Sequence, residues 1–321
     1  MVYIPFFSDT SVPFEPSKDI PSLAGKVILV TGGNTGLGKQ SILELARYGK
    51  PAKIYLAARN QEKAKGAIED VKNHAPDAPI VPLDLDLTSF ESIKKAARTF
   101  ANQEERLDVL MLNAGIMAVP NATTKEGYEI QFGTNHVGHA LLTKLLMPTL
   151  LKTARRPEKP DVRVVVLTSA GLGLASPGEG IKFDTVKTDG SALYTWTRYG
   201  QSKLANALFA RELAKRYPEV KAVAVHPGAV DTQLFFPFAE SFGIFNFAAT
   251  ALVRPFLKTV EMGARNQVWA TVSKQVESGE WYTPVGIKGT VKVRGTDLAR
   301  DDNLAKKLWE WTEKELEGQE I

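Results

Sequence analysis

Two side chains that could move a proton together, Tyr199 and Lys203, stand four residues apart. Residues at positions i and i+4 of an α-helix lie on the same face, one turn from each other. A phenol has a pKa of about 10, and nearby positive charge is needed to lower it far enough for proton exchange near neutral pH. We therefore expect Tyr199 to donate or accept a proton at a substrate oxygen, with Lys203 lowering its pKa.

A second pair, Tyr217 and Lys221, has the same spacing. Pro218 directly follows this tyrosine, and a residue before proline is biased away from the helical conformation. These two side chains should therefore not share a helix face, whereas the first pair opens a helical pattern over Tyr199–Tyr217. The first pair is the better candidate for proton transfer.

A glycine-rich turn at Thr31–Gly38 directly follows one expected strand and opens one expected helix. Glycines let the backbone bend sharply and approach a pyrophosphate, whose charge is met by N–H groups at the helix N-terminus. The turn could also be no more than a tight connection. Its spacing in this context favours nucleotide binding, and the candidate contacts are Gly32, Asn34, Thr35, Gly36, Leu37 and Gly38.

The end of the second expected strand indicates which dinucleotide is bound. NAD enzymes place Asp or Glu about 20 residues beyond the glycine turn to bind the ribose hydroxyls. Here Ala58 and then Arg59 occupy that place, and Lys39 stands just inside the turn. Arginine forks onto phosphate oxygens, so this pattern favours the 2′-phosphate of NADP(H). The alternative is that both cations are solvated surface charges.

Short β-branched runs alternate with longer helical patterns, which indicates βαβ units and a parallel sheet. The expected strands are Lys26–Thr31, Lys53–Ala58, Ile80–Leu83, Val109–Leu112, Val162–Thr168, Ala222–Val225 and a last one at Trp281–Thr283. The expected helices are Gly38–Tyr48, Gln61–His74, Thr88–Glu104, Asn135–Thr153, Tyr199–Tyr217 and Asn303–Glu315. The fold class is therefore α/β, a Rossmann-type doubly wound parallel sheet with helices on both faces. We expect an N-terminal extension at residues 1–22 and one domain at residues 23–321.

The glycine turn and the Tyr199–Lys203 pair, with three further elements in the same order, resemble the short-chain dehydrogenase/reductase family from about Gly25 to Tyr282. The resemblance implies that Asp86 and Leu87 meet the adenine and that Asn113-Ala114-Gly115 shapes a wall of the cofactor groove. It also implies cofactor contacts at Tyr199 and Lys203. In the segment His226–Thr232 it implies contacts at Pro227, Gly228, Val230 and Thr232. Helix capping is an alternative role for Asp86, and a simple turn is one for Pro227-Gly228.

The same resemblance supplies two partners for the tyrosine. Ser169 would orient the substrate oxygen, and Asn135 would hold a water in a proton relay to Lys203. The alternative roles are that Ser169 only forms a turn and that Asn135 only caps a helix. His136 and His139 suggest a metal, but zinc sites normally need three or four protein ligands, so no metal is expected.

Finer resemblance, in Asn135–His139, Ser202–Asn206 and Glu261–Ala264, is to the retinol-dehydrogenase-like branch, which handles lipophilic alcohols, aldehydes and ketones. Seven phenylalanines lie within residues 234–257, six of them crowded into residues 235–247, and an aromatic lid there would suit a bulky apolar substrate. The candidate substrate contacts are Phe235, Phe236 and Phe238. Core packing and a peripheral membrane contact are alternatives for this stretch. Secondary-metabolite ketones, steroids and lipid aldehydes all fit such a site.

Composition limits the remaining possibilities. The 321 residues contain no cysteine and carry a net charge of +4 that is interleaved along the helices, so disulfides, thiolate chemistry and nucleic-acid binding are not expected. Neither a transmembrane stretch nor a signal peptide is expected, and a cytoplasmic location is the default. An NADP-binding redox sensor or scaffold without turnover is the alternative function. Monomer and homodimer both stay open, and by family analogy the last strand and the Tyr199–Tyr217 helix are candidate dimer surfaces.

Overall fold

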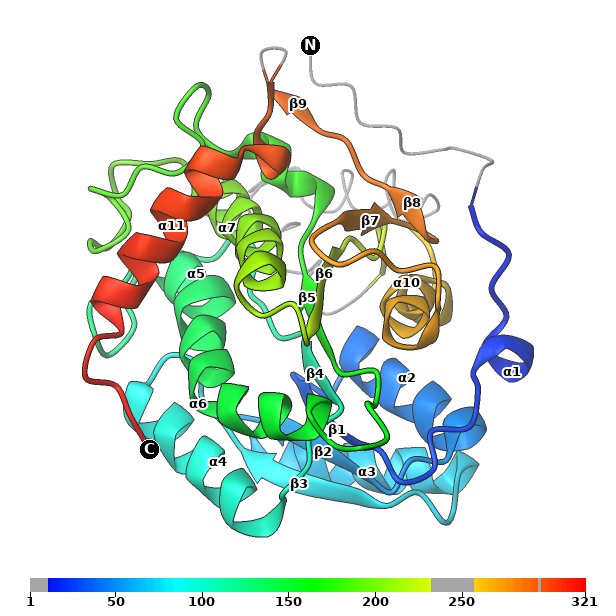
Figure 1. The fold of residues 1–321 in the computed structure, drawn as a ribbon. Helices are drawn as coiled ribbons and strands as arrows, with labels where there is room; N and C mark the ends of the chain where they lie inside the picture. The colour runs from blue at the N-terminus through cyan, green and yellow to red at the C-terminus, as the bar shows by residue number, and fades with distance from the viewer. Residues whose placement is uncertain (1–10, 232–256, 294–295) are drawn as a thin grey trace.

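The computed structural model describes residues 11–231, 257–293 and 296–321. Its centre is an eight-stranded sheet in the order β3-β2-β1-β4-β5-β6-β7-β8, in which only β8 runs antiparallel to its neighbour (Figure 1). The strands are β1 Val27–Thr31, β2 Lys53–Ala58, β3 Ile80–Asp84, β4 Val109–Leu112, β5 Arg163–Leu167, β6 Lys221–Val225, β7 Trp281–Thr283 and β8 Ile287–Lys288. A separate two-stranded ribbon pairs β9 (Lys292–Val293) with β10 (Thr296–Asp297).

Helices cover both faces of the sheet (Figure 1). On one side lie α4 (Phe90–Gln103), α5 (Ile130–Phe132), α6 (Gly138–Ala154), α7 (Thr195–Arg216) and α11 (Asp302–Glu315). On the other lie α2 (Gly36–Glu44), α3 (Gln61–His74) and α10 (Val260–Val272). The shorter helical segments are α1 Pro16–Asp19, η1 Leu45–Gly49, η2 Gly133–Val137, η3 Ala170–Leu174 and η6 Leu298–Arg300. The chain therefore has the expected Rossmann-type, doubly wound architecture.

Burial on both faces explains why the strands are continuous apolar runs. Successive side chains of a strand point to opposite faces. In β1, Leu29 packs into the core under α4, α6 and α7, whereas its neighbours Ile28 and Val30 pack into the core under α2, α3 and α10. All three are fully buried. A polar residue at any of these places would lose contact with water on either face.

The expected strands agree with the observed ones within one residue at each end, but the helix boundaries move. The helix expected over Thr88–Glu104 begins at Phe90, and its N-cap is Ser89, whose side chain accepts a hydrogen bond from the Ser92 N–H. The helix carrying Tyr199 begins four residues earlier than expected, at Thr195. The last strand of the sheet is β8, so Trp281–Thr283 is not the sheet edge.

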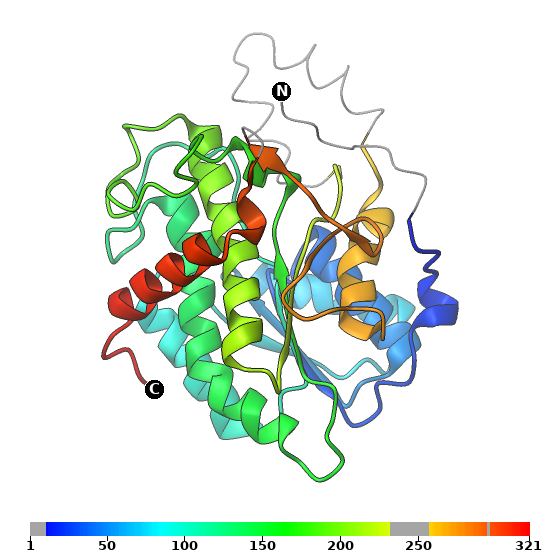
Figure 2. The ribbon, with the colours of Figure 1, turned by 45° about the horizontal axis from the view of Figure 1, so that its top comes forward.

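The C-terminal helix α11 crosses α7, as Figure 2 shows. Trp309 stacks on Phe209 with ring centroids 5.6 Å apart, and Arg216 lies over the same indole at 5.0 Å. Asp302 accepts a hydrogen bond from Arg211 at 2.6 Å. The outer face of α7 in this region is therefore covered by the chain itself, although it was one of the two candidate dimer surfaces.

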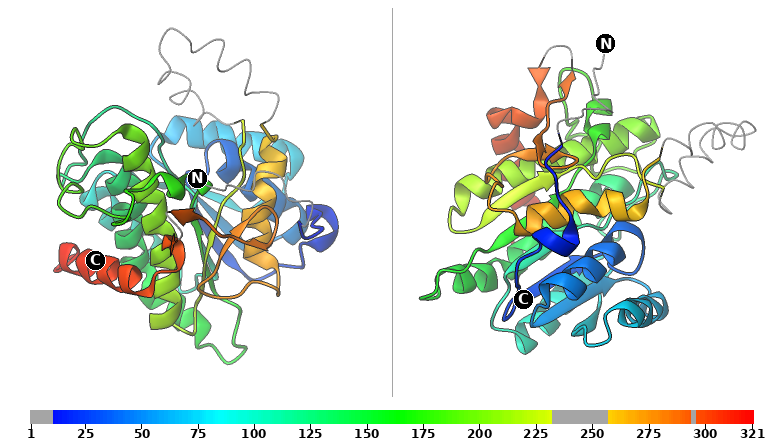
Figure 3. Two further views of the ribbon diagram at one scale, coloured as in Figure 1. Left: turned by 90° about the horizontal axis from the view of Figure 1, so that it is seen from above. Right: turned by 90° about the vertical axis from the view of Figure 1, so that its right-hand side faces the viewer.

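The N-terminal residues that the structure describes pack against the domain, on the side of α2 and α10 (Figure 3). Phe14 and Ile20 are buried in the core on that side, and Val12 donates a backbone hydrogen bond to Val285. Residues 11–22 therefore contribute apolar surface to the same core as the sheet. Among the described helices, none combines the length and the apolar character that crossing a membrane requires.

Two buried histidines lie where the α5–α6 region winds through the π-helical turn η2. His139 Nδ1 lies 3.0 Å from the Asn135 carbonyl, which can only accept, so Nδ1 carries the hydrogen. Nε2 then accepts from Thr31 Oγ1 at 2.9 Å. His136 Nε2 bonds to Thr312 Oγ1 at 3.0 Å on α11. Both rings therefore have structural partners, and burial lowers the pKa of His136 to about 3 and that of His139 to about 4.

These pKa values predict acid sensitivity. The unfolded chain binds a proton at each ring near its ordinary pKa of about 6.5, while the folded chain does not. The contribution of each neutral ring to the free energy of unfolding is therefore fully present above about pH 6.5 and is lost as the pH falls below that value. At about pH 5.5 the loss is about 1.4 kcal/mol per ring. Urea unfolding at about pH 7.5 and 5.5 measures this loss. In His136→Gln, the difference in the free energy of unfolding between the two pH values should be smaller by about 1.4 kcal/mol. If that difference stayed the same, His136 would ionise in the folded protein as readily as in the unfolded chain.

Candidate active site

The carboxyl ends of the parallel strands meet at one edge of the sheet, which is where ligands bind in open α/β folds. β1 leads into Gly32, β2 into Arg59, β4 into Asn113, β5 into Ser169 and β6 into His226. Strand order reverses between β1 and β4, which are adjacent in the sheet although far apart in sequence. The sheet thus brings the predicted cofactor and proton-transfer residues to one edge.

The glycine turn has the backbone that the sequence predicts. Gly32 and Gly36 have φ values of 65° and 50°, a region that favours glycine. A Cβ at Gly38 would lie 2.4 Å from the Gly32 carbonyl oxygen, so only glycine fits there. Helix α2 begins at Gly36, and the side chain of its N-cap Thr35 caps none of its N–H groups. α3, α4, α10 and α11 each have a side-chain cap, so the free N-terminal donors of α2 suit a phosphate.

Asn113 and Ala114 hold this turn against β4. The Asn113 amide donates to the Thr31 carbonyl at 2.8 Å, and the Ala114 N–H donates to Thr31 Oγ1 at 3.0 Å. Gly115 comes next, and a Cβ on it would lie 3.2 Å from both Asn135 Oδ1 and Lys203 Nζ. The wall expected from residues 113–115 therefore lies between the glycine turn and the proton-transfer residues.

Tyr199 and Lys203 lie on one face of α7, and both are buried. The ammonium of Lys203 is 5.8 Å from the centroid of the Tyr199 ring and donates to the Leu167 carbonyl at 3.2 Å. Burial lowers the pKa of Lys203 to about 8 and raises that of Tyr199 to about 12. The shift at Tyr199 is thus opposite to the lowering by Lys203 that the sequence leads us to expect, and the opposing influence comes from Ser169. The competing pair fails as predicted, since Tyr217 caps α7 and Lys221 lies in β6.

Ser169 takes the turn role that the sequence offered as an alternative, and it also lies beside Tyr199. Its hydroxyl accepts a hydrogen bond from the Gly171 N–H at 3.0 Å, which caps the short helix η3 as a turn serine would. A side-chain hydrogen bond between Ser169 and Tyr199 also lowers the pKa of the tyrosine, opposing the effect of burial. The serine hydroxyl and the phenol are therefore neighbours.

Asn135 lies inside the π-helical turn η2 rather than at a helix N-cap. Its amide donates to the Ile116 carbonyl at 3.0 Å and to Ser202 Oγ at 2.9 Å, and its oxygen accepts from the Ile116 N–H at 2.8 Å. Ser202 in turn donates to the Tyr199 carbonyl at 2.8 Å. The turn therefore connects the segment after β4 to the helix that carries the tyrosine.

The two cations expected at the 2′-phosphate behave differently. Arg59 is exposed and forms no ion pair within the described part of the chain. Lys39 instead bonds to Asp70 on α3 at 2.5 Å, and the exposed fractions of the two side chains are 35% and 50%. Pairs this exposed contribute little to stability and open easily. Arg59 is therefore the better placed of the two to meet a phosphate.

The remaining predicted contacts are partly described. Asp86 Oδ1 accepts hydrogen bonds from both the N–H and the hydroxyl of Thr88, and Leu87 is buried. Gly228 has a φ of 93°, as a turn at Pro227-Gly228 requires. Val230 pairs with Lys258 in a parallel bridge. Four predicted contacts, Thr232, Phe235, Phe236 and Phe238, lie outside the described residues.

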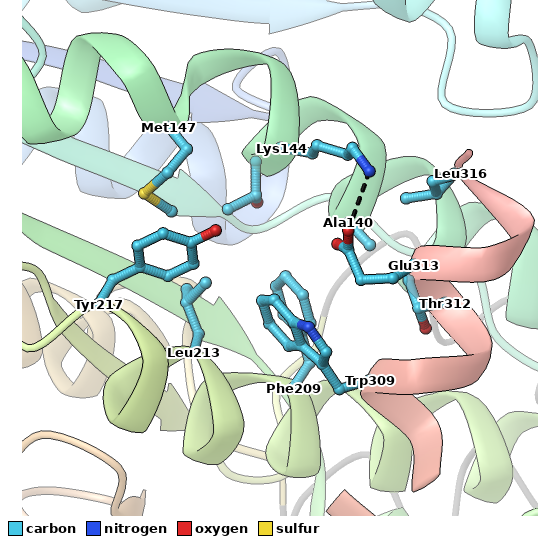
Figure 4. Close-up of a pocket in the computed structure, with 11 residues that line it drawn as sticks. Ala140, Lys144, Met147, Phe209, Leu213, Tyr217, Trp309, Thr312, Glu313 and Leu316 are labelled. Atoms are coloured by element: carbon cyan, nitrogen blue, oxygen red, sulfur yellow. Dashed lines mark hydrogen bonds and ion pairs between the residues drawn. The ribbon is translucent and has the colours of Figure 1, made fainter. Parts of the chain in front are cut away.

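The structure also contains a pocket of about 80 Å³ away from this site (Figure 4). It lies between α6, α7 and α11, and the ion pair of Lys144 with Glu313 at 2.9 Å borders it. Phe209, Tyr217 and Trp309 form much of its apolar wall. None of the predicted site residues lines this pocket, so it is not the candidate active site.

Comparison with known proteins identifies the family. Residues 26–177 match the family model for short chain dehydrogenases. The short-chain dehydrogenase/reductase drtF of Aspergillus calidoustus is 39% identical over 316 residues, covering 94% of this chain and 97% of that protein. The chain belongs to the short-chain dehydrogenase/reductase family. Its members are oxidoreductases with a nicotinamide cofactor, so this protein is an oxidoreductase of that kind.

Other relatives support the finer resemblance. Human retinol dehydrogenase 13 is 36% identical over 303 residues, covering 92% of this chain and 85% of that enzyme.

A crystal structure of an uncharacterized protein from Mycobacterium paratuberculosis superposes with a TM-score of 0.68 at 29% identity, covering 93% of this chain and 96% of the other. The Pseudomonas aeruginosa RhlG/NADP active-site complex has a TM-score of 0.63 at 22% identity, covering 84% and 98%, and shows the shared fold.

Gly171 is a site residue that the sequence did not single out. A Cβ on it would lie 2.8 Å from Cε1 of Tyr199 and 3.2 Å from Oγ of Ser169. The Tyr199 ring is rigid, so it cannot bend away from a new methyl group as the end of a flexible side chain would. The whole ring would have to shift, and its hydroxyl would shift with it. The only sequence signal was the Ala170-Gly171 turn after Ser169, which gives no hint of this contact.

Gly171→Ala in this short-chain dehydrogenase/reductase should therefore lower turnover about 10- to 100-fold, because the methyl group displaces Tyr199. Cofactor affinity should change little, and fluorescence titration with NADPH checks this. Gly66→Ala is the matched control, since a Cβ there has nothing within 4 Å. Full activity in Gly171→Ala would show that the tyrosine position is not critical.

Proposed function

We propose that the protein is an NADP(H)-dependent oxidoreductase that interconverts a carbonyl and an alcohol on a bulky apolar substrate. The observation that carries the proposal is the convergence of Ser169, Tyr199 and Lys203 at the sheet edge where the glycine turn begins. The bound nicotinamide would supply or accept a hydride. The glycine turn, residues 113–115 and the Pro227–Val230 segment would hold it.

In the reducing direction, Tyr199 would give its proton to the substrate oxygen as the carbonyl carbon receives hydride. Burial keeps the phenol protonated at neutral pH, as a proton donor must be. The Ser169 hydroxyl would hold the same substrate oxygen beside the phenol. Lys203, still cationic near neutrality with a pKa of about 8, would stabilise the tyrosinate left behind, and Asn135 would serve the proton relay to Lys203.

The preference for NADP(H) is supported by the second strand. β2 ends in Ala58, without the carboxylate that binds the ribose hydroxyls in NAD enzymes, and the exposed Arg59 follows. Lys39 would join Arg59 only by leaving Asp70. The proposed 2′-phosphate site therefore depends mainly on Arg59.

The apolar substrate class is supported by what surrounds Tyr199. Trp196 packs edge-on against the tyrosine ring, with centroids 6.2 Å apart. Leu174, five residues after Ser169, and Tyr194, two residues before Trp196, are large hydrophobic side chains that are 43% and 68% exposed. The aromatic-rich stretch 234–257, expected from the sequence to act as a lid, lies almost wholly outside the described residues. Retinol dehydrogenase 13, a relative, is named for a lipophilic alcohol.

We further propose a cytoplasmic location.

The Tyr199 assignment has a direct test. Tyr199→Phe should lower hydride transfer at least 100-fold, because the proton donor is lost, while NADPH still binds. NADPH oxidation with aromatic ketones, steroids, retinal and long-chain aldehydes measures turnover, and fluorescence measures binding. Tyr217→Phe, in the other pair of the same spacing, should leave both unchanged. Substantial turnover in Tyr199→Phe would contradict the assignment, whereas binding without turnover in the wild type would favour the redox-sensor alternative.

Arg59→Ala tests the cofactor preference. It should weaken NADPH binding about 10- to 100-fold, since a charge-assisted, two-pronged contact with phosphate is removed. NADH lacks that phosphate, so its affinity should change less than about twofold and provides the internal control. Titration of both cofactors against both proteins gives the four dissociation constants. Equal losses for the two cofactors would refute the phosphate contact.

A further inference from the structure

Helix α10 carries two adjacent amide side chains, Asn266 and Gln267, that are wholly buried. Buried amides need hydrogen-bond partners, so the groups they bond to reveal what they hold in place. The sequence patterns gave no role to either residue. Their partners lie on opposite sides of the proposed cofactor crevice.

Gln267 bonds to the glycine-turn side. Its Nε2 lies 2.6 Å from Ser41 Oγ, 3.2 Å from the Leu37 carbonyl and 3.2 Å from Asn113 Oδ1. A carbonyl can only accept, so the nitrogen and not the oxygen of the amide must face Leu37. Because Asn113 donates onward to the Thr31 carbonyl at 2.8 Å, Gln267 links helix α2, the end of β4 and the end of β1.

Asn266 bonds to the opposite side. Its amide nitrogen donates to the His226 carbonyl at 2.7 Å and to the Tyr282 carbonyl at 3.2 Å, and its oxygen accepts from the Gly286 N–H at 3.0 Å. These bonds fix the start of the segment that contains Pro227, Gly228 and Val230.

One turn earlier in α10, Gly263 lets the helix contact both sides at once. A Cβ on it would lie 2.5 Å from Val230 Cγ2 and 2.8 Å from Leu37 Cδ2. Val230 and Leu37 are both among the residues predicted to contact the cofactor. Helix α10 therefore contacts both sides of the crevice directly at Gly263, and it also bonds to both sides through the side chains of Asn266 and Gln267.

A structural role alone does not account for Gln267. Its Oε1 is buried and has no hydrogen-bond partner among the described residues. A buried unpaired polar atom is costly, and an apolar side chain of similar volume would avoid that cost. The amide therefore serves here as a donor, and its two N–H groups are shared among the Leu37 carbonyl, Ser41 Oγ and Asn113 Oδ1.

We propose that α10 is a brace that holds the two sides of the nicotinamide-cofactor crevice at a fixed separation, with Gln267 as its positioning residue. The inference rests on the cofactor contacts proposed above. The brace touches neither Arg59 nor the proton-transfer residues. It therefore acts on the part of the cofactor that NADPH and NADH share, and it acts on binding rather than on turnover.

Gln267→Met keeps the volume of the side chain and removes its donors. Dissociation constants for NADPH and NADH should both rise about tenfold, the effect of losing a hydrogen bond or two, and by equal factors. The rate at saturating cofactor should stay within about twofold of the wild type. A residue with only a structural role would lower the melting temperature and leave both dissociation constants unchanged.

Thr271→Val is the matched control, because Thr271 is buried on the same helix and its hydroxyl donates to the Gln267 backbone carbonyl at 2.8 Å. It should lower the melting temperature without changing cofactor affinity. If Gln267→Met does not fold, Ser41→Ala removes one of its partners and should weaken both cofactors in the same direction. Unchanged affinity in the folded variant would overturn the brace. A wild type that binds neither cofactor would instead refute the proposed function.

Discussion

The carbonyl oxygen of Leu167, at the end of β5, accepts hydrogen bonds from two side chains of α7. Lys203 donates at 3.2 Å and Asn206 at 2.9 Å. Thr168, the next residue, donates from its hydroxyl to the Lys203 carbonyl, also on α7. These contacts fix the helix against the strand end, so the positions of Tyr199 and Ser169 relative to each other follow from them.

Burial determines the electrostatics of the site more than pairing does. The pKa of Tyr199 is raised and that of Lys203 is lowered, which in each case favours the uncharged form. Because the same cause acts on both groups, the phenol stays protonated at neutral pH, while the pKa of the amine, about 8, lies close to neutrality. The packing that buries the two groups therefore sets their protonation states.

Local patterns were enough for the sheet and for the main proton-transfer pair. The glycine turn, the strand limits and the Tyr199–Lys203 spacing depend on neighbours within a few residues, so the sequence predicts them well. The turn role of Ser169, one of the two alternatives, is the one that the structure shows, and the same hydroxyl also contacts Tyr199. The Tyr217–Lys221 pair was excluded correctly because Pro218 is a local signal.

What the sequence could not predict depends on contacts between distant segments. Lys39 finds Asp70 on another helix, and no spacing rule connects the two. The π-helical turn around Asn135 follows from its bonds to Ile116 and Ser202. Gly171 matters because of a tyrosine 28 residues later, and Gln267 because of a glycine turn more than 200 residues earlier. Such residues become visible only when the strands have been placed side by side.

The position of α11 has a consequence for the order in which the protein matures during synthesis. Domains fold as the chain leaves the ribosome, from the N-terminus onward. The outer face of α7 stays uncovered until Trp309 has emerged and can stack on Phe209. Arg211 likewise lacks Asp302 until the same late segment emerges, whereas Arg216 already pairs with Glu212 on α7 and gains only the Trp309 ring later. The helix that carries Tyr199 is therefore made about 100 residues before Trp309, the residue that completes its packing.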